Sequence, residues 1–278
     1  MDTTVEQAIL QSGLDLIDAR ALLRHVLGID DAWLIAHSRD ELTFDQIEKF
    51  AMLIVRRREG EPVAHLTGTR EFFGLEFTVT PAVLIPRPET ELLVEWVLER
   101  FAQNAEGLVL DLGTGSGCIA ISIALARPRM QVVALDSRHA ALDVARANLR
   151  RHGVDNVRLG KSDWFAAVAG DRFDVIVSNP PYIAVDDPHL ALGDLRFEPA
   201  GSLTSGVDGL DAVRTIVAAA PRYLRPGGCF VCEHGYDQAP RCRKLLEDAG
   251  FAQVFSRSDL AGIERISGGR LDVKPRPG

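Results

Sequence analysis

The chain has 278 residues, of which 46% are hydrophobic and 25% charged, ordinary values for a globular protein that forms one large α/β domain and a small extra domain. No run approaches the roughly 20 apolar residues of a membrane span, and the acidic start Met1–Glu6 lacks the features of a secretory signal, so we expect a cytoplasmic protein with no membrane association. The net charge of −8 lowers the expectation of direct nucleic-acid contact, although it does not exclude a local basic patch.

Residues 1–70 predict a domain of several short helices. Apolar residues recur at helical spacing from Leu14 to Leu27, and this stripe ends at Gly28. The basic run Arg56–Arg58 predicts a solvated face near a helix end, with docking of a partner as the alternative. Two sequences have the capping-box spacing that satisfies free backbone N–H groups at a helix start: Thr3-x-x-Glu6 and Thr43-x-x-Gln46.

The pattern changes to that of a β-hairpin over 71–86, which we expect to link two domains. The segment Phe72–Val79 is aromatic and β-branched, and it contains a glycine that can make the turn. After it, Ile85–Glu91 leads into an amphipathic stretch. Pro88 suits a first helical turn, and the neighbouring glutamates complement the helix dipole.

From residue 87 to residue 278 the chain alternates between strands and helices. Such alternation predicts a parallel sheet that is covered by helices on both faces. The last segments, 253–255 and 265–273, predict a closing antiparallel pair, and the tail 274–278 predicts disorder. The predicted strands contain 108–110, 132–135, 157–159, 175–177 and 229–231, and the helices between them include 119–126 and 140–149.

The cysteines give no sign of a metal or redox site. Cys229 and Cys232 have CxxC spacing, but their segment reads as a buried strand, in which positions three apart point to opposite faces. No second CxxC or His pair completes a zinc set. We therefore expect reduced cysteines in the core and no bound metal.

A glycine-rich turn follows the first strand of the sheet, in the sequence Leu110–Cys118. Glycines there let the backbone approach a ligand at the carboxyl edge of the sheet. Cys118 occupies the last position of G-x-G-x-x-G, so the dinucleotide fingerprint fails. The candidate cofactor contacts are Asp111, which can favour a cationic ammonium group directly or through water, and Gly113, Thr114, Gly115, Ser116 and Gly117.

Acids also follow the second and third strands. Asp136 can accept hydrogen bonds from both hydroxyls of a ribose, with an N-cap role as the alternative. Asp163 can accept from an adenine amino group while Trp164 lines the ring, although a plain loop with a core tryptophan would look the same. Three acids after three successive strands resemble the cofactor site of the Rossmann-like methyltransferase superfamily, which implies S-adenosyl-L-methionine as cofactor and S-adenosyl-L-homocysteine as product.

The fourth strand runs directly into Asn179-Pro180-Pro181-Tyr182, the candidate catalytic and substrate-binding loop. Two prolines stiffen it. The amide oxygen of Asn179 and the carbonyl of Pro180 can accept both hydrogens of one NH2 group, and Tyr182 offers a flat face for stacking. Because a conjugated nitrogen is a poor nucleophile, this positioning and the strengthening of both bonds in the transition state are the expected sources of catalysis.

These features together resemble the protein-(glutamine N5) methyltransferase family, the HemK or PrmC enzymes. The resemblance implies a class I Rossmann-like methyltransferase sheet with a helical N-terminal domain that docks peptide chain release factors. It implies methylation of the glutamine in their Gly-Gly-Gln motif. It also implies that Gly113–Gly117, Asp136, Trp164 and Asn179 hold the cofactor. The motifs that carry it include Gly68–Phe73, Ile85–Glu91, Ser162–Phe165, Asn179–Tyr182 and Arg196–Pro199.

The N-P-P-Y loop is shared with enzymes that methylate exocyclic amines of nucleic-acid bases, so such an enzyme is the main alternative. A second alternative is a protein that binds the cofactor without catalysis. Arg87–Glu91 are expected either near the pocket or simply at a helix start. Glu198 and Glu233–Gly235 match family patterns without a physical role. We expect a monomer.

Overall fold

The computed structural model describes residues 3–272 and divides into two compact units. One unit contains the described residues up to Thr69 together with His189–Phe197, and the other contains Arg70–Pro188 and the described residues from Glu198 onward. The segment 189–197 was not expected in the first unit. The predicted limits at 70 and 86 remain predictions, and the tail 274–278 lies outside the described residues.

The first unit is helical, as its periodicity predicts. Its helices enclose an apolar core that includes Leu22, Leu34 and Phe50. The helices are α1 (Val5–Gln11), α2 (Leu16–Leu27), α3 (Asp31–Ala36), α4 (Phe44–Arg58) and α5 (Val63–Thr67), and two 3-10 turns, Pro188–Ala191 and Gly193–Phe197, cover most of 189–197.

The first predicted capping box is wrong by one residue. Thr4, not Thr3, caps α1: its hydroxyl accepts from the Gln7 amide at 3.3 Å, and the Gln7 side chain accepts from the Thr4 amide at 3.0 Å. Thr3 instead accepts a bond from the amide of Leu42, so its backbone is committed to that contact before the helix begins. The cap at Thr43 and the end of α2 at Gly28 are confirmed.

The basic run at the end of α4 is only partly a solvated face. The side chains of Arg56 and Arg58 are exposed, whereas Arg57 is half-buried between two acids. Its guanidinium lies 2.7 Å from Asp18 and 3.2 Å from Asp194, which belongs to the late segment of this unit. Arg57 therefore ties segment 189–197 to α4, a contact that the basic run does not reveal.

The second unit begins with the predicted hairpin, β1 (Thr69–Phe72) and β2 (Leu75–Thr78). Its two turn residues, Phe73 and Gly74, both have positive φ, at 53° and 73°. This is the backbone that two-residue hairpin turns require, and it is unusual for phenylalanine. Bonds to Glu71 and Glu91 hold the two turn amides in place.

A seven-stranded sheet forms the body of this unit, in the order β5-β4-β3-β6-β7-β9-β8. The first five strands are parallel, and β9 pairs antiparallel with β8, as predicted, and also with β7. The strands are β3 (Gly107–Leu112), β4 (Met130–Asp136), β5 (Val157–Lys161), β6 (Phe173–Ser178), β7 (Leu224–Glu233), β8 (Phe251–Ser258) and β9 (Glu264–Leu271).

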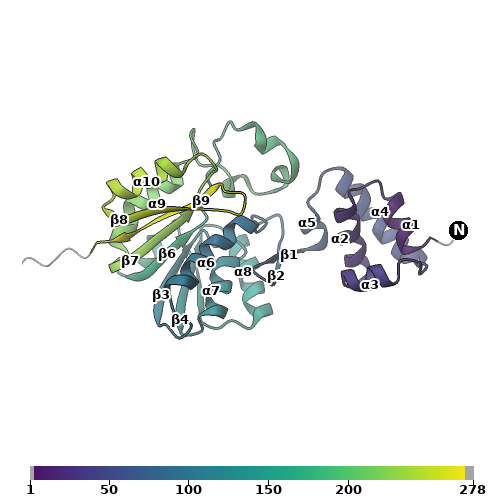
Figure 1. Ribbon diagram of the computed structural model, residues 1–278, viewed down its shortest axis with the longest axis horizontal. Coiled ribbons are helices and arrows are strands. Elements are labelled where there is room, and N and C mark those ends of the chain that lie inside the picture. The colour runs from purple at the N-terminus through teal and green to yellow at the C-terminus, as the bar shows by residue number, and fades with distance from the viewer. Residues whose placement is uncertain (1–2, 273–278) are drawn as a thin grey trace, which may run out of the picture. The chain divides into compact units, whose positions relative to one another are not determined.

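Helices cover both faces of the sheet, with α6 and α7 on one side and α9 and α10 on the other (Figure 1). The two apolar cores include Trp96 and Ile121 on the first side and Val213 and Leu246 on the second. The predicted α/β fold is therefore confirmed. The helices are α6 (Glu91–Arg100), α7 (Cys118–Ala126), α8 (His139–His152), α9 (Asp211–Ala219) and α10 (Ala239–Asp248).

The strand order reverses between β3 and β6. From β3 the chain proceeds to β4 and β5 on one side, and then returns to place β6 and β7 on the other. The loops at the carboxyl ends of β3 and β6 diverge there, which leaves a crevice at a topological switch point. Ligands bind at this position in open α/β sheets.

All four cysteines are free, but the expectation that all are buried is wrong for Cys229, which is partly exposed in the middle of β7. Burial raises the pKa of the Cys118 and Cys242 thiols to about 12, so neither forms a thiolate near neutral pH. Among residues 3–272, no helix has the length and apolar character needed to cross a membrane. Nor do the described side chains include a cluster suited to a metal ion.

Candidate active site

A cavity of about 250 Å³ lies at the switch point of the sheet. Its walls come from the glycine turn after β3, the loops after β4, β5 and β6, and the segment before α6. The predicted site residues that line it are Gly113, Thr114, Gly115, Ser116, Asp136, Asp163, Trp164, Asn179 and Pro181. Four other predicted residues, Asp111, Gly117, Pro180 and Tyr182, lie outside its lining.

The glycine turn needs its glycines for conformation. Gly113, Gly115 and Gly117 have φ of 75°, 54° and 84°, which disfavours any residue with a Cβ. Gly117 also begins α7, where a Cβ would lie 3.2 Å from Ile121 and 3.3 Å from Ala145. Gly117 therefore shapes the turn and packs the helix, and does not line the cavity.

Asp111 is fully buried beneath this turn. One carboxylate oxygen accepts from the Thr114 hydroxyl at 2.6 Å, while Oδ1 lacks a well-formed hydrogen bond among the described residues. Burial raises the pKa of Asp111 to about 7, against the lowering effect of the Thr114 bond. A nearby cation would offset that burial, so the site fits the ammonium group of an amino-acid cofactor. Since Asp111 does not line the cavity, contact through water fits better than direct contact.

Asp136 lies at the end of β4 and joins two parts of the cavity wall. Its Oδ2 accepts from the Gly115 amide at 3.0 Å, and its Oδ1 accepts from the Arg138 amide at 2.9 Å. It is not the N-cap of α8, a position that Arg138 occupies. Because a carboxylate has about four acceptor positions, Asp136 keeps capacity for two hydroxyls of a ribose.

Trp164 lines the cavity in a strained backbone conformation. Its φ is 44°, which is uncommon for a bulky residue and costs of the order of 1–3 kcal/mol. The Ser162 hydroxyl holds the loop by donating to the Trp164 carbonyl at 2.7 Å and accepting from the Ala167 amide at 3.0 Å. Such strain at a cavity wall fits a residue placed to contact a planar ring.

Asn179 continues β6 into the cavity and is held by Thr90, a residue of the segment 87–91 that had no assigned role. Its Nδ2 donates to the Thr90 hydroxyl at 3.0 Å, and that hydroxyl donates to Glu233 at 2.7 Å. Tyr182 donates to the other oxygen of Glu233 at 3.0 Å. The same carboxylate therefore links two members of the predicted catalytic loop.

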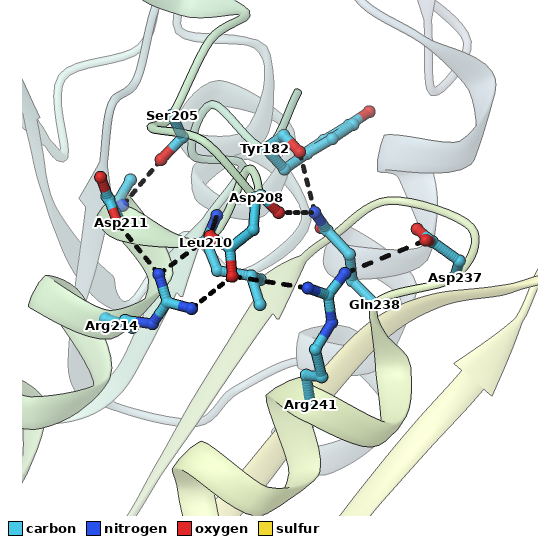
Figure 2. A network of polar contacts seen from close by, with 10 residues as sticks. Tyr182, Ser205, Asp208, Leu210, Asp211, Arg214, Asp237, Gln238 and Arg241 are labelled. Carbon is cyan, nitrogen blue, oxygen red and sulfur yellow. Dashed lines mark hydrogen bonds and ion pairs between the residues drawn. The ribbon is translucent and has the colours of Figure 1, made fainter. Parts of the chain in front are cut away.

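Tyr182 is also fixed through its backbone (Figure 2). The side-chain Nε2 of Gln238 donates to the backbone carbonyls of Tyr182, at 2.9 Å, and Asp208, at 3.3 Å. Gly209 packs so closely that a Cβ there would lie 2.2 Å from the Tyr182 oxygen. Arg214 and Arg241 pair with Asp208, and the Arg214 bond is the main cause that lowers the pKa of this acid to about 2. This network anchors the end of the N-P-P-Y loop.

The motifs without an assigned role now have structural contacts. Arg87 donates to both oxygens of Glu198, at 2.8 and 2.9 Å, and the Glu198 side chain is buried. His234 contacts the Ser267 hydroxyl at 2.8 Å, and burial lowers the pKa of its imidazole. Thr90 ends a 3-10 turn that has Pro88 at its start, so the segment 87–91 both begins a helix and reaches the cavity.

The family model of the methyltransferase small domain matches residues 89–203, and that of the PrmC N-terminal domain matches residues 6–68. A crystallised methyltransferase from Pyrococcus furiosus shares the fold, with a TM-score of 0.56 and 20% identity, and the match covers 79% of this chain and 98% of that one. The cavity at the switch point and these matches define the class of the protein, a Rossmann-like methyltransferase.

The relatives identify the family more narrowly. A release factor glutamine methyltransferase from Burkholderia pseudomallei is 56% identical over 96% of both chains. The enzyme of that name from Bordetella pertussis is 52% identical over 97% of this chain and 100% of its own. The chain belongs to the release factor glutamine methyltransferase family.

Proposed function

We propose that the chain transfers a methyl group from S-adenosyl-L-methionine to the side-chain amide nitrogen of the glutamine in the Gly-Gly-Gln motif of peptide chain release factors. Family membership over nearly the full chain supports this substrate. The observation that carries the reaction type is Asn179 at the cavity wall, with its NH2 group already bonded to Thr90. A substrate that takes part in translation also favours the cytoplasm as its location.

The cofactor half of the site would use the residues around the glycine turn. Backbone groups of 113–116 would face the cofactor, Asp136 would accept from its ribose hydroxyls, and Asp163 and Trp164 would border its adenine. Buried Asp111 would favour the ammonium end. When bound, S-adenosyl-L-methionine supplies an electrophilic methyl group on a positively charged sulfur.

The acceptor half would position the glutamine. The oxygen of Asn179 and the carbonyl of Pro180 would accept the two hydrogens of the substrate NH2 group, which leaves its lone pair directed at the methyl carbon. Both bonds strengthen as positive charge develops on the nitrogen, which lowers the barrier. Tyr182 would border the planar amide. No general base is needed if the proton leaves to water after transfer.

Labelled methyl transfer to purified release factor tests this proposal. We expect the wild-type release factor to accept label and a variant with the Gly-Gly-Gln glutamine changed to alanine to accept none. Bulk DNA and ribosomal RNA, incubated beside it, test the nucleic-acid alternative and should stay unlabelled. Equal labelling of both release factors, or labelling of nucleic acid alone, would show that the substrate is different.

A further inference from the structure

Glu233 is a buried acid at the carboxyl end of β7 that lies outside the lining of the cavity. Only 2% of its surface is exposed, and each of its two oxygens accepts one hydroxyl proton, from Thr90 at 2.7 Å and from Tyr182 at 3.0 Å. Thr90 is equally buried and also contacts Asn179. Three separate segments thus meet at one carboxylate.

The direction of these bonds decides how the Asn179 amide lies. A hydroxyl has one proton, and the ionised carboxylate of Glu233 can only accept, so the Thr90 proton points to Glu233. The Thr90 oxygen must then accept from its other neighbour. That neighbour is therefore the NH2 side of Asn179, at 3.0 Å, and the carbonyl Oδ1 is left as the acceptor for a substrate.

We infer that Thr90 and Glu233 are positioning residues that fix the Asn179 amide with its oxygen available to the substrate NH2 group. This inference rests on the proposed function of the Asn179–Tyr182 loop. If the side-chain amide of Asn179 were flipped, its NH2 group would face the substrate NH2 group, and two donors cannot form a hydrogen bond with each other. Only the orientation that directs Oδ1 of Asn179 toward the substrate can hold the substrate NH2 group for methyl transfer.

Protonation of Glu233 would reverse this arrangement. A protonated carboxyl can donate to Thr90, whose own proton then turns toward Asn179 and selects the flipped amide. Burial raises the pKa of Glu233 to about 7, against the lowering effects of the bonds from Thr90 and Tyr182. The arrangement in which Asn179 directs Oδ1 toward the substrate is therefore expected above about pH 7, where Glu233 is ionised.

Other charged and titratable groups surround Glu233. Glu89 raises its pKa and Arg265 lowers it, while the thiols of Cys118 and Cys232 have raised pKa values and stay neutral. Tyr182, whose pKa lies well above 10 mainly because of the Glu233 charge, keeps its proton. Asp111 is the other acid with a pKa near 7, so a comparison with a Glu233 variant is needed to separate the two.

The first test changes the hydroxyl that joins Asn179 to Glu233. Thr90→Val keeps the shape of the side chain and removes the hydroxyl, whereas Thr90→Ser keeps the hydroxyl. We expect kcat on release factor to fall roughly tenfold or more in Thr90→Val, with KM changed less than about threefold, and to recover in Thr90→Ser. Ser122→Ala removes a buried hydroxyl of α7 elsewhere in the core and should behave as wild type. Wild-type kcat in Thr90→Val would overturn the inference.

The second test needs no substrate, so its failure is distinguishable from failure of the proposed function. The side-chain NH2 signals of Asn179 in NMR spectra, assigned by their absence from Asn179→Ala, should shift with a midpoint near pH 7 in wild type. They should show no such step in Glu233→Gln. An unchanged titration in Glu233→Gln would overturn the inference, even if release factor is methylated normally. Lack of methylation by wild type would overturn the proposed function alone.

Discussion

The glycine-turn end of the cavity is held by bonds between residues close in sequence, whereas the Asn179 end is held by bonds between distant segments. Thr114 and Asp111 are 3 residues apart, and Gly115 and Asp136 are 21 apart. At the other end, the bond from Asn179 to Thr90 spans 89 residues, and the bond from Thr90 to Glu233 spans 143.

The two ends of the cavity should therefore affect different steps, cofactor binding at one end and methyl transfer at the other. The shape of the first end follows from the backbone of one turn and two adjacent strand ends, so changes there should act mainly on cofactor binding. The Asn179 end depends on the packing of side chains from three separate segments. Changes there should therefore act mainly on the reaction step. Each prediction below tests one side of this division.

The largest expected effect is on turnover, at the Asn179 end. Asn179→Ala removes one of the two acceptors proposed for the substrate NH2 group, and loss of one comparable group typically costs about 100- to 1000-fold in kcat. Release factor methylation measures it, and circular dichroism with thermal unfolding verifies that the fold is intact. Turnover close to wild type in a folded Asn179→Ala enzyme would contradict the proposed mechanism.

An intermediate effect is expected on cofactor affinity. Asp136→Ala removes the acceptor proposed for the ribose hydroxyls and also the bonds to Gly115 and Arg138 that shape the wall. We expect S-adenosyl-L-methionine to bind roughly 10- to 100-fold more weakly by calorimetry. Asp136→Asn, which keeps one acceptor oxygen, should lose less. If Asp136→Ala binds the cofactor as tightly as wild type, the ribose assignment is wrong.

The smallest expected effect is on stability. Burial raises the pKa of Glu233 in the folded chain from 4.5 to about 7, so the folded chain holds this proton more tightly than the unfolded chain. Ionisation of Glu233 therefore costs stability as the pH rises from about 4.5 to about 7. Glutamine carries no charge, so the Tm of Glu233→Gln relative to wild type should rise across this window by a few degrees.

Thermal unfolding at several pH values measures this difference, and Ser122→Ala should follow the wild-type pH dependence. If the Tm difference between Glu233→Gln and wild type stays constant over this pH range, burial does not raise the pKa of Glu233. A gain in stability together with a loss of turnover in Glu233→Gln would separate the role of Glu233 in the reaction from its role in the fold.

A larger share of the residues predicted for the cofactor end than of those predicted for the acceptor end lines the cavity. Asp136 and Asp163 could be selected because Asp136 ends β4 and Asp163 lies two residues after β5, and parallel strands bring their carboxyl ends to one edge. The partner of Asn179 could not be found in this way. Thr90 belongs to the segment Arg87–Glu91, which was expected near the pocket or at a helix start, but its sequence does not indicate a bond to Asn179. Only the packing of the segment before α6 against β6 and β7 brings it to Asn179 and Glu233.

Backbone strain could not be predicted from the sequence either. The positive φ of Trp164 and of Phe73 occurs at residues whose type disfavours it, so composition gives no warning. The predicted cap at Thr3 was wrong for a similar reason. The Thr3 carbonyl accepts a hydrogen bond from the Leu42 amide and not from the helix. In each case the folded structure overrides the local preference of the residue.

Segment 189–197 has a consequence for how the chain is made. The helices of the first unit leave the ribosome early, but the residues that complete this unit, including the Asp194 partner of Arg57, follow after roughly 120 further residues. Vectorial synthesis therefore cannot finish the first unit before much of the sheet has been translated. For the same reason, a fragment that stops after Thr69 lacks part of its own helical unit, and one that starts at Arg70 carries a segment without its partner.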